Sequence, residues 1–108
     1  MTGTASQIEW AEIIRPQVGA EFDRVAGALE QVARGQDESS RTETRAIIAI
    51  LEEKRAEVMA NEHAGYFIRG WGERSDQVRQ MISRDSRWQA IQAARRERRQ
   101  SLTGATQL

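Results

Sequence analysis

The chain has 108 residues, of which 39% are hydrophobic, 30% charged and 6% aromatic, and its formal net charge is zero. This length allows one domain with a modest core, and the composition is too apolar for a fully disordered chain. The absence of cysteine excludes disulfides, thiolate metal sites and cysteine nucleophiles. No apolar run approaches the roughly 18 residues that span a bilayer, and residues 1–6 lack the features of a signal peptide. We therefore expect a cytoplasmic protein.

The first predicted helix covers residues 5–34. Thr4 and Gln7 have the spacing of a capping box, and Gly35 is a natural stop. Between them, apolar residues recur every three or four positions, which is the pattern of a coiled-coil seam: Ile8, Ala11, Ile14, Val18, Phe22, Val25, Leu29 and Val32. Pro16 lies inside this seam and predicts a kink or a break after Arg15, because it removes a backbone donor.

Two further helices are predicted, over residues 41–69 and 76–100. Ser40 and Glu43 suggest a second capping box, and Ser75 or Asp76 can cap the third helix. A glycine-rich aromatic joint around Trp71 separates the two. Residues 101–108 are polar and predicted to be a flexible tail.

These elements predict an all-α fold: one domain over residues 1–100, built from three long helices in an elongated, antiparallel bundle. The long seam of the first helix favours self-association into a homo-oligomer. A monomeric three-helix bundle is the alternative. Charge is unevenly placed, since residues 1–72 carry 8 basic and 12 acidic side chains and residues 73–108 carry 8 and 4. This polarity favours association with a second copy or with an acidic partner.

The sequence offers little catalytic chemistry. His63 is the only histidine, and Ala60 stands where a di-iron helix would have glutamate. Glu52, Glu53 and Glu57 alternate with basic residues, as on a solvated helix face. We therefore predict no enzyme activity, no catalytic residue, no cofactor, no metal and no small-molecule substrate.

Two groups of residues are candidates for binding. The first is a protein interface, because tryptophan and apolar seam residues often anchor protein partners: Trp10, Trp71, Phe22, Val25 and Leu29. Trp10 lies one position off the seam, so we expect it to be partly exposed. Core and interface are equally good interpretations of Trp71, whereas Tyr66 and Phe67 fit a core.

The second group is a basic sector that can follow a phosphate backbone: Arg84, Arg87, Arg95, Arg96, Arg98 and Arg99. A solvated helix end is the other interpretation, because cations are favoured near a helix C-terminus.

The opening segment carries a motif, Gln7-Ile8-x-Trp10-Ala11-Glu12-x-Ile14-Arg15. It resembles the start of small helical proteins of bacteriophages and other mobile elements. Ser6 stands where those proteins have lysine, and the resemblance covers about 14 residues. It implies a mobile-element origin and no catalytic residues.

The leading hypothesis is a non-enzymatic inhibitor or adaptor that binds itself and a host or viral protein. The alternative is a nucleic-acid-binding packaging or regulatory subunit that uses the arginine-rich helix.

Overall fold

The fold is described from a computed structural model that covers residues 1–72 and 74–107, without the side chains of 74–75 and 103–107. Within these residues it contains five α-helices and no strand. They are α1 (Ala5–Arg34), α2 (Glu38–Met59), α3 (Ala64–Gly70), α4 (Arg74–Ser83) and α5 (Ser86–Gln107). The all-α prediction is confirmed, whereas the prediction of three long helices is wrong. The molecule measures 67 × 23 × 18 Å, so most of its residues lie near a surface.

Helix α1 has the predicted bounds. The Thr4 hydroxyl accepts from the Gln7 amide at 3.2 Å, and the Gln7 side chain accepts from the Thr4 amide at 2.9 Å. This reciprocal capping box satisfies two otherwise unpaired donors. Gly35 caps the other end. Pro16 is exposed and does not split the helix, because its ring lies on the solvent side where the missing hydrogen bond is tolerated.

Helix α2 begins earlier than predicted. Asp37, rather than Ser40, is the N-cap, and its carboxylate accepts from the Ser40 amide at 2.8 Å. The predicted helix over residues 41–69 is interrupted after Met59. There the N-terminal segment of the chain lies alongside residues 62–64, so that Thr2 donates to the Glu62 carbonyl at 2.6 Å and accepts from Ala64 at 2.9 Å. These bonds replace the helical ones, and α3 starts afresh at Ala64.

The predicted third helix is likewise two helices. Asp85 precedes α5, and its carboxylate accepts from the Arg87 amide at 2.8 Å. It also forms an ion pair with Lys54 of α2 at 3.3 Å. An aspartate in this position ends one helix and caps the next. The helix α5 then continues to Gln107, through most of the segment predicted to be a tail, and Leu108 lies outside the described residues.

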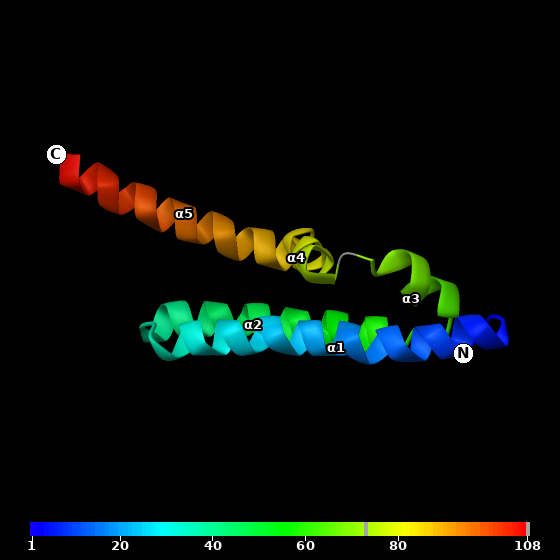
Figure 1. Ribbon diagram of the computed structural model, residues 1–108. Helices are drawn as coiled ribbons and strands as arrows, with labels where there is room; N and C mark the ends of the chain where they lie inside the picture. The colour runs from blue at the N-terminus through cyan, green and yellow to red at the C-terminus, as the bar shows by residue number, and fades with distance from the viewer. Residues whose placement is uncertain (73, 108) are drawn as a thin grey trace.

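Helices α1 and α2 form an antiparallel hairpin, and α3 and α4 cover one part of it (Figure 1). The core lies in this part and is built from buried apolar residues of α1 to α4 and the joint: Ala11, Ile14, Val18, Phe22, Ile47, Ile50, Leu51, Val58, Ala64, Phe67, Trp71, Val78 and Ile82. Helix α5 diverges from the hairpin and adds only the half-buried Trp88 and Ile91. Its Cα atoms approach α2 and α4, but none of the described ones comes within 8 Å of α1.

Candidate functional site

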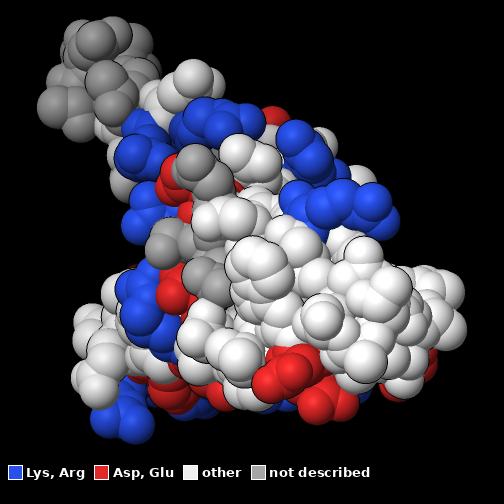
Figure 2. All heavy atoms as spheres, turned by 45° about the vertical axis from the view of Figure 1, so that its right-hand side comes forward, with Lys and Arg blue, Asp and Glu red and all other residues white. Residues whose placement is uncertain are grey.

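The side of α1 that faces away from α2 and α3 carries two large exposed hydrophobic residues. Trp10 is 60% exposed and Ile13 is 59% exposed. They are three positions apart and therefore neighbours on the helix surface. Figure 2 shows a broad uncharged area at the end of the molecule that includes α3, with acidic residues along its lower edge and basic residues along its upper edge. Adjacent exposed large hydrophobic side chains such as Trp10 and Ile13 are typical of an interaction site.

Trp10 and Ile13 belong to a longer exposed stripe on α1. Its members recur at steps of four and three residues, and none is charged: Ser6, Trp10, Ile13, Gln17 and Ala20. We call this stripe the outer α1 face. Such spacing keeps side chains on one side of a helix against a partner helix. Glu9 flanks the stripe near one end, and Arg24 follows it at the other end, where it is paired with Glu21 at 3.0 Å.

The other residues predicted for a protein interface lie elsewhere. Phe22 is 1% exposed and Trp71 is 3% exposed, and their rings pack against each other with centroids 5.8 Å apart. Both are core residues because α3 and α4 close over that part of the hairpin, so in this fold neither is open to a partner. Val25 and Leu29 are half-buried at the edge of the core. Of the five predicted residues, only Trp10 lies on an open face.

The arginines predicted for nucleic-acid binding differ in whether they pair with acidic residues or are exposed. Arg87 is paired with Asp85 at 2.9 Å and with Glu53 at 2.7 Å. Arg95 and Arg98 point back to α2 and bind Glu43. Arg84 and Arg96 are exposed, and neither has an ion-pair partner among the described residues. Arg99 borders a hollow of about 350 Å³ that it shares with Arg95, Arg98, Leu102, Gln36 and Ser40.

Arg95, Arg98, Glu43, Thr44 and Gln36 form a polar layer between α5 and α2. Arg98 binds Glu43 through two nitrogens at 2.6 and 3.0 Å, and Arg95 reaches the same carboxylate at 3.4 Å. Arg95 also donates to the Thr44 hydroxyl at 3.0 Å, which donates to the Gln36 side chain at 2.6 Å. The hydrogen bonds from Arg98, followed by those from Arg95, hold the pKa of the Glu43 carboxyl below its ordinary value.

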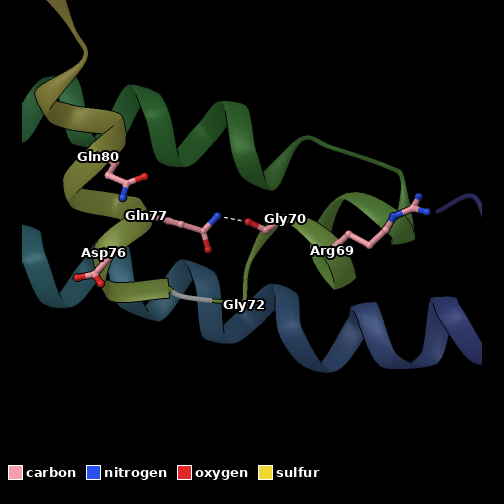
Figure 3. A pocket seen from close by; sticks show the side chains of 6 residues that line it. All are labelled: Arg69, Gly70, Gly72, Asp76, Gln77 and Gln80. Carbon is pink, nitrogen blue, oxygen red and sulfur yellow. Dashed lines mark hydrogen bonds between the residues drawn. The ribbon is translucent and has the colours of Figure 1, made fainter.

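A second hollow, of about 400 Å³, lies between α3 and α4 beside the glycine-rich joint. It is lined by Arg69, Gly70, Gly72, Asp76, Gln77 and Gln80. The Gln77 side chain donates to the Gly70 carbonyl across it, while Arg69 points away from Asp76 (Figure 3). The charged groups do not converge on one point, so this hollow has no evident ligand chemistry.

Neither a metal-binding cluster nor a membrane-spanning helix occurs among the described residues. No group of three or more His, Asp or Glu side chains within the described part of the chain has a metal-binding arrangement. His63 is exposed and its Nδ1 lies 2.6 Å from the Thr2 hydroxyl. No helix in residues 1–72 and 74–107 is both long and apolar enough to cross a membrane.

Comparison with known proteins adds no relative. No protein-family model matches the chain, and no curated protein and no solved structure is detectably similar to it.

The sequence interpretation overlooked Ile13, and it assigned Glu43 only to a capping box and not to a contact with arginines. Ile13 could have been found by following a second stripe of three- and four-residue steps from Trp10, parallel to the core seam. Glu43 had no such signal, because its two arginine partners lie 52 and 55 residues further along the chain.

Proposed function

We propose that this protein is a non-enzymatic protein-binding protein that self-associates through the outer α1 face. The observation that carries the proposal is the pair of exposed large hydrophobic residues, Trp10 and Ile13, on one helix surface. Covering such side chains removes apolar area from water, which stabilises association by about 25 cal/mol per Å² before the costs of binding.

The rest of the outer α1 face supports a helical partner. Gln17 and Ala20 continue the stripe without a charge, so packing against them leaves no unpaired ion in the interface. Alanine also allows close approach of a second helix backbone. A second copy offers the same uncharged stripe, and two such stripes can pair around a twofold axis.

An inhibitor or adaptor role fits a surface of this kind, as does the resemblance of the opening motif to mobile-element proteins. In either role, a host or viral protein would bind the outer α1 face. It would either compete with the second copy of the chain or bind in addition to it. We propose Trp10 as its main anchor, because a large side chain with an indole donor suits both apolar and polar contacts.

Light scattering after size-exclusion chromatography tests self-association. At tens of micromolar we expect the wild-type chain to be a dimer or larger, and the Ile13→Ser variant to shift toward monomer. Val32→Ser is the matched control, since Val32 is 53% exposed at the opposite end of the same helix. A strictly monomeric wild type, or an equal effect of both substitutions, would overturn the proposed interface.

A further inference from the structure

The inward-facing stripe of α5 changes character halfway along the helix. Trp88 and Ile91 begin it and pack against the core. The next positions at steps of four and three residues are Arg95 and Arg98, where a packed helix would normally continue with apolar side chains. Helix α5 therefore faces the hairpin with two hydrophobic residues and then two cations.

These two cations share one glutamate. The Glu43 carboxylate receives both nitrogens of the Arg98 fork, at 2.6 and 3.0 Å, and lies 3.4 Å from Arg95. Its side chain is 19% exposed, and those of Arg95 and Arg98 are 22% and 50% exposed. A fork gripping two oxygens of one anion is also the geometry with which arginine binds a phosphate group.

The described contacts between this half of α5 and α2 are polar rather than apolar. Beyond Ile91, no described residue of α5 belongs to the core or packs against it as a partly buried hydrophobic residue. The helix also starts at a break, since α4 ends at Ser83 and α5 begins at Ser86. A helix that is separated from its predecessor by a break and held to its neighbour by a polar attachment can swing away when that attachment is exchanged for another anion.

We propose that α5 is a cationic arm for the phosphate backbone of nucleic acid, and that Glu43 occupies the place of phosphate until nucleic acid displaces it. Release would add Arg95 and Arg98 to the already exposed Arg96. The three charges lie within about one helical turn and point over a broad sector. A regular polyanion can satisfy several closely spaced cations at once, whereas an acidic protein must place each carboxylate separately. None of these residues belongs to the outer α1 face.

The test compares two variants of the full chain that change net charge equally. Glu43→Gln removes the carboxylate that binds Arg95 and Arg98. Glu38→Gln is the control, because Glu38 lies on the same helix, is exposed and forms no ion pair among the described residues. Fluorescence anisotropy with a labelled 20-base-pair duplex is measured from low to physiological salt.

We expect Glu43→Gln to bind the duplex about five- to tenfold more tightly than wild type, and Glu38→Gln less than about twofold. The affinity of Glu43→Gln for the duplex should also fall more steeply with salt than that of wild type. The difference should correspond to about one to two additional phosphate contacts. If both variants gained affinity for the duplex equally, net charge alone would explain the effect. The proposal that Glu43 occupies the place of phosphate would then be overturned. Absence of binding at low salt, or tighter binding of polyglutamate than of the duplex, would overturn nucleic acid as the ligand.

A second measurement follows the arm in the unmodified chain. Protein labelled with 5-fluorotryptophan gives fluorine signals for Trp10, Trp71 and Trp88. We expect the duplex to shift the Trp88 signal, because Trp88 lies on the inward stripe of α5, and to leave Trp71 in the core unchanged. Binding without any change at Trp88 would show that the arm does not move, and would overturn displacement.

Discussion

The two ends of the hairpin are built from the same two helices but are covered differently. At the proximal end, formed by residues 5–22, residues 51–59, α3 and α4, the covering helices and their joint supply Phe67, Trp71 and Val78, all buried. At the distal end, formed by residues 23–34, residues 38–50 and α5, the start of the covering helix packs Trp88 and Ile91 against the core, and the rest of it supplies Arg95 and Arg98. The same hairpin is thus closed by buried apolar side chains at one end, and at the other by a cover that is polar beyond Ile91.

Because of this difference, we expect one end to stabilise the fold and the other to be able to change its contacts. Apolar burial is the main source of folding free energy, and buried aromatic residues make many contacts at once. Ion pairs that remain partly in water contribute much less and can exchange partners. We therefore expect the proximal end to set the stability of the protein, and the distal end to open without global unfolding.

The largest expected loss of stability follows from a truncation in the proximal core. Phe22→Ala removes a side chain that is 1% exposed and packs against Trp71. Such truncations leave a cavity, and we expect a loss of about 3–5 kcal/mol in the free energy of unfolding. Urea titration followed by circular dichroism measures the change. A loss below about 1 kcal/mol would mean that this end is not a close-packed core.

The matched truncation at the distal end is Leu29→Ala, on the same helix two turns further on. Leu29 is only half-buried, so less apolar area returns to water. We expect a loss of about 1–2 kcal/mol in the same urea titration. If Leu29→Ala were as damaging as Phe22→Ala, α5 would have to cover the distal end more fully than the structure shows, and the comparison of the two ends would fail.

The helix starts at the two ends provide a third comparison. Thr4 caps α1 at the proximal end through a capping box, and Asp37 caps α2 at the distal end. We expect Thr4→Ala and Asp37→Ala each to cost about 1 kcal/mol in the thermal unfolding free energy. Ser40→Ala is the control for the second cap, because its side chain is not the N-cap; a larger loss for Ser40→Ala than for Asp37→Ala would contradict the assignment.

The caps also show how far the sequence could predict this fold. The bounds of α1 followed from Thr4, Gln7 and Gly35, because capping signals are local. The breaks after Met59 and Ser83 depend on distant partners. Thr2 pairs with the backbone of residues 62–64, and Lys54 fixes Asp85, and neither contact leaves a trace in the local pattern.

The candidate sites likewise differ in whether a local pattern or the packing of distant helices decides their exposure. Exposure of Trp10 followed from its place beside the core seam, which is a property of one helix. The burial of Trp71 and the engagement of Arg95 and Arg98 with Glu43 depend on how separate helices meet. Residue type and spacing identified these side chains as noteworthy, but only the packing of α5 and α4 on the hairpin decides whether a partner can reach them.

The smallest expected effect is the response of the two ends to acid. Arg98 and Arg95 lower the pKa of Glu43, and the side chain of Arg87, together with its backbone amide and Lys54, lowers the pKa of Asp85. A carboxyl whose pKa is lower in the folded state stabilises that state above its unfolded pKa, roughly 4. That stabilisation is lost as the pH falls through the folded pKa. Both carboxyls attach α5 or its start, so acid should loosen the distal end first.

Fluorine spectra of 5-fluorotryptophan-labelled protein can follow both ends during one titration. As the pH falls below about 4, we expect the Trp88 signal to change before that of Trp71, which lies in the apolar core. In Glu43→Gln the Trp88 signal should already be displaced at neutral pH and should respond less to acid, since one of the titrating attachments is gone. If Trp71 and Trp88 change together in the wild-type chain, the two ends unfold as one unit. The contacts that attach α5 would then break together with the core and would not open separately.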